Sequence, residues 1–315
     1  MKVALITPGL ANIDNGNRVT ALRYARILRR LGHQVVVETS YDGGTCDLLI
    51  ALHAGKSSDS ILRFKEQHPD LPLVVVLTGT DLYRDLKKNG KARHSLDDAT
   101  HLVVLQRMGL AEIPSHLRGK ASVIYQSAGC PGGGTRRPAS YFRVCVVGHL
   151  RPEKDPFRAA LAVRSLPDTS RIRILHIGAA LNEKMEERAM REAQVNPRYR
   201  WMGGMPRWKT RRFIAGSHLV AITSRIEGSS NVLSEALACN VPVVASRIPG
   251  LIGTLGPDYP GYFTAGDTRE LALLLDRAET DGAFYASLTA WCRDAAHLVS
   301  PEREAEAWSG LLNEV

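Results

Sequence analysis

The sequence has no long hydrophobic run. Its longest uncharged apolar stretches, such as Leu71–Thr80, reach about half of the roughly 20 residues that a helix needs to cross a bilayer. The N-terminal segment Met1–Pro8 carries one charge and then an apolar stretch that is too short for the core of a signal peptide. We therefore expect no integral membrane association, and we expect a cytoplasmic protein.

Cysteines are few and widely spaced. The chain has five of them, at positions 46, 130, 145, 239 and 292. Their number is odd, and no two of them form a CxxC pair. This pattern argues against a disulfide framework and against a zinc site.

Aromatic residues are scarce, at 6% of 315 residues, and no basic block is interleaved with them. Lysine and arginine total 41 against 32 acidic residues, which gives a net charge of +9. The excess is scattered through predicted helices, as at Arg23, Arg26, Arg29 and Arg30, and at Arg207, Lys209, Arg211 and Arg212. Because nucleic-acid-binding faces gather basic and aromatic residues together, the charge favours a phosphate-bearing small molecule over nucleic acid.

Several common motifs are missing. Gly55-Lys56-Ser57 looks like the end of a P-loop, but Ile50 stands where that motif requires glycine. No GxGxxG follows the first predicted strand, which disfavours a dinucleotide-dependent redox enzyme. The sequence has no Asp-x-Asp to clamp a metal-bound nucleotide diphosphate, and no GxSxG or HExxH. We expect neither a metal nor a cofactor.

Predicted strands and helices alternate along the chain. Arg18–Leu31 has apolar residues at helical spacing, and Gly32 follows it as a helix-ending glycine. The apolar runs are continuous rather than alternating, which is typical of a parallel sheet covered on both faces. In the first half these runs are Val3–Ile6, Val35–Val37, Leu48–Ile50, Leu73–Leu77 and Leu102–Leu105, and a further helix is predicted near Ser58–Gln67.

A Gly/Pro-rich segment, Ala128–Ser140, interrupts this pattern and has the composition of a linker. A second alternating series then begins at Arg143–Gly148. Its later strands are predicted at Ile172–Ile177, Leu219–Ile222 and Val241–Ala245, and its last helices at Phe284–His297 and Pro301–Leu312. We expect an α/β chain of two Rossmann-like domains that face a central cleft, with limits near 1–135 and 136–296.

The most informative stretch runs from Ser224 to Gly250. Glu227 lies in a predicted loop, Ser229 or Ser230 can cap the next helix, and Glu235 lies one turn into it. Backbone N–H groups near Ser230, Asn231 and Val232 would face an anion at the carboxyl end of a sheet. The alternative is that both glutamates are capping or solvated groups.

Two other loops carry polar groups at predicted strand ends. Arg151 and Lys154 follow Gly148, where two cations can neutralise a diphosphate without a metal. We expect Gly148, like Ser229 to Val232, to contact the donor. The polar loop before the first helix includes Asn15, Gly16, Asn17 and Arg18, which can bind an anionic acceptor. The alternatives are a solvated basic loop and an ordinary strand-to-helix loop.

At these residues the chain resembles the GT-B glycosyltransferases of the large GT4-type group. The most specific part is the pair of glutamates at E-x7-E, Glu227 and Glu235, with the ALACNVPVVAS that follows. The resemblance implies that Glu227 contacts the donor sugar, that Glu235 binds the nucleotide ribose, and that Arg151 and Lys154 hold the diphosphate. It also implies metal independence and a last segment, about 297–315, that packs back on the first domain.

A narrower resemblance is carried by NGNRVTALRYARILRRLGH, HLRPEKDP and SRIPGLIGTLGPDYPGYF. These segments are similar to the selenosugar synthases of selenoneine biosynthesis. Such enzymes join selenium from selenophosphate to the anomeric carbon of a UDP-sugar, here UDP-N-acetylglucosamine or UDP-glucose. With such an acceptor, we expect Asn15, Asn17 and Arg18 to contact its phosphate, together with Lys56.

One position departs from the wider group. Many GT4-type enzymes have His-Gly-x-Asp after a first-domain strand, whereas this chain has Thr78 in place of the histidine and Asp81 at the end of the motif. We expect Thr78 and Asp81 to be among the acceptor-binding residues. A selenium nucleophile is already largely ionised near neutral pH, so it has little need of a general base. His53 and His94 also lie in the first half, where we expect surface or satisfied histidines.

Two alternatives stay open at this point. One is an enzyme of the same fold that uses a hydroxyl acceptor, either a sugar or a lipid. The other is a nucleotide-sugar-binding protein without catalysis. A comparison of donor binding with donor consumption separates them.

Overall fold

The computed structural model describes residues 1–9, 16–132 and 136–315. Asn15, one of the predicted acceptor residues, lies outside the described residues. The chain forms two compact units. Unit 1 comprises Met1–Gln126 and Pro301–Val315 with the short stretch Glu227–Ser229, and unit 2 comprises Ser127–Ile226 and Ser230–Ser300. None of the described helices is long and apolar enough to cross a membrane.

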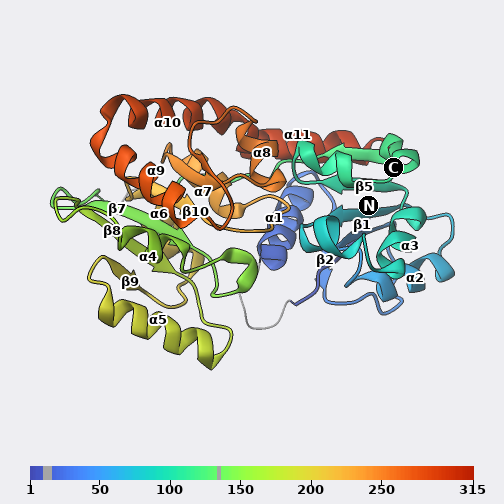
Figure 1. Ribbon diagram of the computed structural model, residues 1–315. Helices are drawn as coiled ribbons and strands as arrows, with labels where there is room; N and C mark the ends of the chain where they lie inside the picture. The colour runs from blue at the N-terminus through green and yellow to red at the C-terminus, as the bar shows by residue number, and fades with distance from the viewer. Residues whose placement is uncertain (10–15, 133–135) are drawn as a thin grey trace. The chain divides into compact units, whose positions relative to one another are not determined.

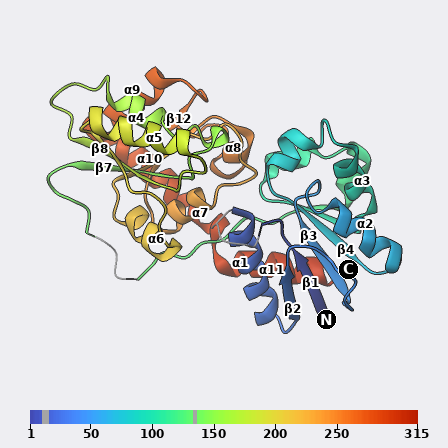
Figure 2. The same ribbon diagram turned by 90° about the horizontal axis from the view of Figure 1, so that it is seen from below.

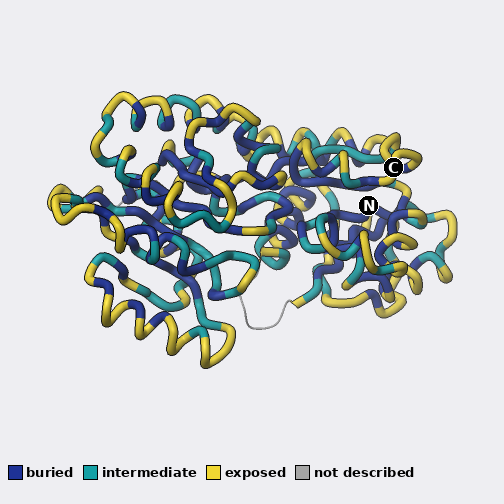
Figure 3. The backbone as a smooth tube through the Cα atoms, in the orientation of Figure 1, coloured by how far each residue is buried: buried dark blue, intermediate teal, exposed yellow. Residues whose placement is uncertain are grey.

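Unit 1 is built on a six-stranded parallel sheet with the order β2-β1-β3-β4-β5-β6. The runs of Val, Leu and Ile predicted as strands form its centre, and β3 and β4 are buried along their whole length. Buried residues are dark blue in Figure 3. The strands are β1 (Lys2–Ile6), β2 (Gln34–Glu38), β3 (Leu48–Leu52), β4 (Leu73–Leu77), β5 (His101–Val104) and β6 (Ala121–Val123).

Helices cover both faces of this sheet. On one face α1 (Gly16–Arg30) and α11 (Pro301–Leu312) share a core with β1, β3, β4 and β5. The other core is formed with α2 (Ser58–Gln67) and α3 (Gly90–Asp98). Short turns complete the unit: η1 (Asp81–Asp85), η2 (Arg107–Glu112) and η3 (Ser115–Lys120). Figures 1 and 2 show α11 alongside α1.

A buried ion pair fastens α11 to α1. The Nε of Arg23 lies 3.0 Å from each carboxylate oxygen of Glu304, and both side chains are almost fully buried. Next to this pair, the rings of Tyr24 and Trp308 meet edge to face at 4.7 Å. The last described residues are therefore part of the core of unit 1.

Unit 2 is built on a second six-stranded parallel sheet, with the order β12-β11-β10-β7-β8-β9. Its strands are β7 (Phe142–Val147), β8 (Ile172–Ile177), β9 (Tyr199–Trp201), β10 (Leu219–Ile222), β11 (Val243–Ser246) and β12 (Tyr262–Phe263). Its helices and short turns are η4 (Pro152–Lys154), α4 (Arg158–Val163), α5 (Glu183–Val195), α6 (Arg207–Ala215), α7 (Asn231–Ala238), α8 (Pro249–Leu255), α9 (Thr268–Thr280), α10 (Gly282–Ala295) and η5 (Ala296–Val299).

Strand order identifies where each sheet can bind a ligand. In a doubly wound sheet, ligands bind at the carboxyl ends of the two strands where the order reverses direction. In unit 2 these strands are β7 and β10, so the loops that begin at Gly148 and Thr223 lie side by side. In unit 1 they are β1 and β3, which precede the start of α1 and the loop at His53.

The alternation predicted from the sequence is confirmed, with shifts of a few residues at element ends. The first helix begins at Gly16 rather than Arg18, and Gly32 follows it with a φ of 90°. The two units divide after Gln126 and after Ser300. The domain limits at 1–135 and 136–296, which were drawn from the linker composition, stay a proposal.

The prediction that no disulfide forms is wrong. Cys130 and Cys239 are bonded, with their Cα atoms 4.9 Å apart. They are separated by 109 positions in the sequence, and only the folded chain brings them together. Because Cys239 directly follows α7, the bond ties the Gly/Pro-rich segment to the end of that helix. Cys145 and Cys292 are buried free thiols.

Candidate active site

The loop after β7 carries the predicted diphosphate-binding cations. Pro152 starts the short turn η4, which ends at Asp155 in a left-handed conformation with a φ of 43°. The Asp155 carboxylate holds this geometry by accepting from Arg158 Nε at 2.9 Å. Arg151 and Lys154 are thereby placed at the carboxyl end of the sheet, where the strand order reverses.

Hydrogen bonds join this loop to the loop after β10. Thr223 Oγ1 donates to the carbonyl oxygens of Lys154 and Asp155, at 2.9 and 3.0 Å. The backbone N–H of Arg225 donates to Glu153 O at 2.8 Å. The structure therefore brings Lys154 next to the chain segment that leads into Glu227 and α7.

A glycine allows the loops after β7 and β8 to meet closely. A Cβ on Gly178 would lie 1.9 Å from Gly148 O, so no side chain fits there. The amide of Leu150 donates to Ala179 O at 3.0 Å, and the amide of Ala179 donates to His149 Nδ1 at 3.1 Å. The amide of Gly148, one of the predicted donor-binding residues, donates to Ile177 O at 2.9 Å, so this backbone is fixed as well.

A buried histidine also holds Gly148. His176 Nε2 lies 3.1 Å from Gly148 O, and because a carbonyl only accepts, this nitrogen carries the proton. The Nδ1 atom then accepts from the Tyr199 hydroxyl at 2.9 Å. Burial lowers the pKa of His176 to about 4, so the ring is neutral at pH 7. No sequence motif points to a role for His176, because it is a lone histidine in a predicted strand.

We expect His176 to make unit 2 sensitive to acid. The unfolded chain binds the proton near pH 6.5 and the folded chain only near pH 4, so the free energy of unfolding falls as the pH drops through this window. The loss between pH 7 and pH 5 should be about 2 kcal/mol. Urea unfolding at the two pH values measures it in the wild type and in His176→Gln, which should lack this part of the dependence.

The exposed His94, in unit 1, offers a control for the loss of a histidine as such. His94→Gln should keep the part of the pH dependence that is assigned to His176. If His176→Gln has the same dependence as the wild type, the acid sensitivity comes from other groups and the assignment to His176 is wrong.

Helix α7 presents its N-terminus at the same edge of the sheet. Ser230 is its N-cap, and the hydroxyl oxygen accepts from the Leu233 N–H at 3.3 Å, as the sequence predicted for one of the two serines. Ser229 lies in the preceding loop with Glu227, and Asn231 and Val232 form the first turn. The positive end of the helix dipole and these amides favour an anion here.

Glu235 has a partner that the sequence did not reveal. Its carboxylate is buried on α7 and lies 2.9 and 3.0 Å from Nη2 and Nε of Arg207 on α6. Arg207 was one of several basic residues in a predicted helix, and 28 positions separate it from Glu235. This ion pair fixes the orientation of a carboxylate that would otherwise be costly to bury.

The arrangement in unit 2 suits an anion better than a metal. Arg151 Nε is buried and has no hydrogen-bond partner among residues 1–9, 16–132 and 136–315, which indicates a ligand that accepts hydrogen bonds. Within the same part of the chain, no three His, Cys, Asp or Glu side chains are grouped as metal ligands. Two loop cations and a helix N-terminus can together bind and stabilise a leaving diphosphate.

In unit 1, Asp81 organises the loop after β4. It is fully buried, and its carboxylate accepts from the backbone N–H groups of Thr78, Gly79 and Ala54 at 2.8 to 3.1 Å. Thr78, which stands in place of a histidine, is half-buried at the end of that strand. The structure thus gives Asp81 a positioning role for Thr78.

His53 lies at the end of β3 in a conformation that is rare for a side-chain-bearing residue, with a φ of 71°. The Lys56 N–H donates to His53 Nδ1 at 3.2 Å, so Nε2 carries the proton and faces Thr80 Oγ1 at 3.1 Å. His53 is therefore a satisfied buried histidine, as expected, and His94 is exposed beside Asp98. The Lys56 side chain is exposed.

The first turn of α1 contains the remaining predicted acceptor residues. Gly16 is exposed, and Asn17 and Arg18 are half-buried. Thr20 Oγ1 donates to Gly16 O at 2.9 Å and accepts from Gln126 Nε2 at 2.7 Å. Both this turn and the Lys56 loop follow strands at the reversal point of the unit 1 sheet.

A family model described as Glycosyl transferases group 1 matches residues 135–293, about half of the chain. This segment includes the loop after β7, the whole of α7 and Arg207. It contains the two glutamates and the two loop cations that the sequence singled out.

Solved structures with similar folds share little sequence with the chain. Anabaena HepE in complex with UDP and glucose has a TM-score of 0.78 and 16% identity, with 100% of both chains covered. Sucrose-phosphate synthase from Thermosynechococcus elongatus has a TM-score of 0.80 and 16% identity, covering 99% of this chain and 98% of that one. These likenesses confirm the GT-B α/β fold that the resemblance implied.

Proposed function

Because the chain belongs to the group 1 glycosyltransferases, we propose that it joins the anomeric carbon of a UDP-sugar to the selenium of selenophosphate. The donor is UDP-N-acetylglucosamine or UDP-glucose, and the products are a selenosugar, UDP and phosphate. The assignment of the donor site rests on Arg151, which lies at the reversal point of the unit 2 sheet. Its Nε is buried and has no hydrogen-bond partner among the described residues.

The diphosphate and the ribose of the donor are held by unit 2. Arg151 and Lys154 bind the diphosphate, and the start of α7, from Ser230 to Val232, supplies backbone amides for the same charge. Glu227 orients the sugar, and Glu235 binds the ribose hydroxyls. UDP in the structure of HepE and UDP-2-fluoro glucose in an E. coli trehalose-6-phosphate structure with a similar fold support a UDP-sugar as donor.

The acceptor is held by unit 1. Gly16, Asn17 and Arg18 at the start of α1, with Asn15 and Lys56, bind the phosphate of selenophosphate. Thr78 stands where many relatives have histidine, and Asp81 positions it. This substitution supports an acceptor that needs no deprotonation, because selenophosphate attacks as an anion whereas a sugar or lipid hydroxyl must lose a proton.

The reaction balances with one water molecule. Selenium attacks the anomeric carbon, a C–Se bond forms, and the bond to the β-phosphate oxygen breaks to release UDP. The charge that develops on UDP is stabilised by Arg151, Lys154 and the α7 N-terminus, so no metal is needed. Water then cleaves the P–Se bond, which gives phosphate and the selenol of the sugar.

An anaerobic incubation with each UDP-sugar and selenophosphate tests this proposal. Mass spectrometry should find a product with the selenium isotope pattern, together with an equal amount of UDP. Parallel reactions contain thiophosphate, phosphate or buffer in place of selenophosphate. Product in the selenophosphate arm supports both substrates at once.

The other outcomes contradict defined parts of the proposal. Donor binding with turnover only on a sugar or lipid hydroxyl overturns the acceptor and keeps the donor. Donor binding without turnover on any acceptor indicates a nucleotide-sugar-binding protein. Failure to bind either UDP-sugar overturns the roles of Glu227, Glu235, Arg151 and Lys154.

Glu235→Gln should weaken UDP binding by about tenfold, because a charged hydrogen bond to the ribose contributes about 1.5 kcal/mol. Binding of 2′,3′-dideoxy-UDP, which lacks the ribose hydroxyls, should be much less affected. Calorimetric titration of both nucleotides into the wild type and the variant measures the difference.

Arg207→Gln distinguishes ribose binding from a purely structural ion pair. If Glu235 served only to hold Arg207, both variants would weaken UDP and 2′,3′-dideoxy-UDP equally. Such a result contradicts the assignment of Glu235 to the ribose.

A further inference from the structure

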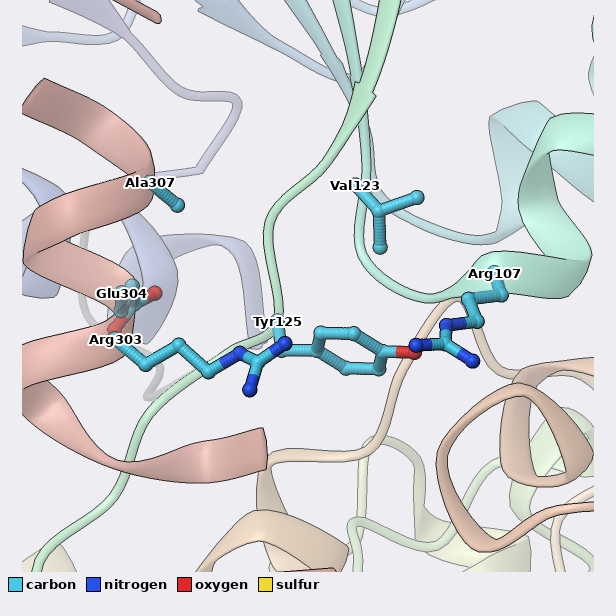
Figure 4. A pocket seen from close by; sticks show the side chains of 6 residues that line it. All are labelled: Arg107, Val123, Tyr125, Arg303, Glu304 and Ala307. Atoms are coloured by element: carbon cyan, nitrogen blue, oxygen red, sulfur yellow. The ribbon is translucent and has the colours of Figure 1, made fainter. Parts of the chain in front are cut away.

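Unit 1 contains a pocket that the proposed reaction does not use. Its volume is about 240 Å³, and it lies where β5 and β6 end. Arg107 begins the turn η2 just after β5, and Tyr125 follows β6. The pocket is lined by Arg107, Val123, Tyr125, Arg303, Glu304 and Ala307, the last three from α11, as Figure 4 shows.

The pocket carries an excess of positive charge. Its one acidic side chain, Glu304, is buried and bonded through both oxygens to Arg23. Arg107 and Arg303 are exposed residues whose guanidinium groups lie at the two ends of the Tyr125 ring. The lining therefore has two arginines and one glutamate, and that glutamate is already paired with a third arginine, Arg23. Both arginines of the lining are exposed to solvent.

Tyr125 adds a hydroxyl beside Arg107. Its ring is buried, and the hydroxyl is hydrogen-bonded to Arg107. Burial raises the pKa of Tyr125, and the nearby Arg107 and Arg303 only partly oppose this. The hydroxyl is therefore protonated at neutral pH and can share hydrogen bonding with an anion that Arg107 binds.

The size of the pocket limits what it can hold. A water molecule occupies about 30 Å³ in the liquid, so the pocket has room for about eight waters. A phosphate ion with a few more atoms fits in this space. Pockets for drug-sized ligands begin at about 300 Å³, so a nucleotide-sugar is too large.

We propose that this pocket binds the phosphoryl group of a small molecule between Arg107 and Arg303, separately from the donor loops of unit 2. Guanidinium groups match phosphate oxygens in geometry and charge, and two of them can share one dianion. Val123 and Ala307 provide apolar walls for the few carbon atoms such a ligand carries.

Calorimetric titration with inorganic phosphate tests the proposal. A Lys56→Ala, Lys154→Ala background reduces phosphate binding at the proposed acceptor residues and at the donor loops, so that one saturable site should dominate. Arg107→Gln and Arg303→Gln should each weaken this binding at least tenfold. Arg26→Gln, at an exposed position on α1, should leave it unchanged.

Two results overturn the proposal. One is the absence of saturable phosphate binding, and the other is equal affinity in the wild type and in both pocket variants. Tyr125→Phe keeps the buried ring and is therefore the variant least able to disturb the fold. It should weaken phosphate binding only a few-fold. Thermal unfolding of each variant shows that the fold is retained.

Steady-state kinetics with added phosphate distinguishes whether the phosphoryl group in this pocket belongs to the acceptor or to a separate effector. Only this kinetic experiment rests on the proposed function. If phosphate competes with selenophosphate, and Arg107→Gln removes the competition, the pocket holds the acceptor phosphate, and its assignment to the start of α1 and Lys56 is wrong. If phosphate changes the rate without competition, the pocket holds a separate effector. The titration needs no turnover, so its failure is distinguishable from failure of the proposed function.

Discussion

Lys154→Ala should lower kcat/KM for the proposed transfer by about two orders of magnitude, which corresponds to about 3 kcal/mol of transition-state stabilisation. UDP gains charge as the anomeric carbon leaves it, and Lys154 lies on a turn that is held from both sides. Thr223 binds its carbonyl oxygen, and its methylene groups lie beside Gly148. The lysine is therefore positioned before the donor arrives.

The effect should appear mainly in kcat, because the charge that Lys154 meets is larger in the transition state than in the bound donor. Steady-state rates with a saturating donor measure it. Lys184→Ala, at an exposed position on α5, is the matched control and should be near wild type. Turnover by Lys154→Ala at the wild-type rate contradicts the role of this residue in leaving-group stabilisation.

Loss of the Cys130–Cys239 disulfide should lower the free energy of unfolding of unit 2 by about 4 kcal/mol. The bond closes a loop with a sequence separation of 109, and a cross-link of this span restricts the unfolded chain strongly. Cys130→Ser should produce the loss, and so should a reductant added to the wild type. Urea unfolding with and without reductant measures both.

Two comparisons make this prediction specific. Cys46→Ser, in unit 1, should retain the sensitivity to reductant, and Cys130→Ser should have none left. If the wild type unfolds at the same urea concentration with and without reductant, the disulfide contributes nothing to stability.

The fold was largely predictable because its signals are local. Runs such as Leu73–Leu77 are apolar throughout, which is typical of central strands in a parallel sheet. Gly32 and Ser230 mark a helix end and a helix start through hydrogen-bonding rules that act within a few residues. The resemblance then supplied roles for Glu227 and Glu235 that spacing alone left open.

What the sequence did not reveal depends on contacts between distant residues. Arg207 meets Glu235 because α6 and α7 pack together, and neither helix carries a pattern that names its neighbour. His176 supports Gly148 from an adjacent strand for the same reason. The disulfide was missed because an odd cysteine count and the lack of CxxC describe motifs, whereas Cys130 and Cys239 pair through the fold.

The place of α11 in the chain has a consequence for synthesis on the ribosome. The β1–β6 sheet emerges early, but the face that packs against Trp308, Leu311 and Leu312 stays uncovered until the residues after 300 have been made. Most of unit 2 is translated in between and can complete its own core first. Unit 2 should therefore become protease-resistant on the nascent chain before unit 1, although the synthesis of unit 1 begins earlier.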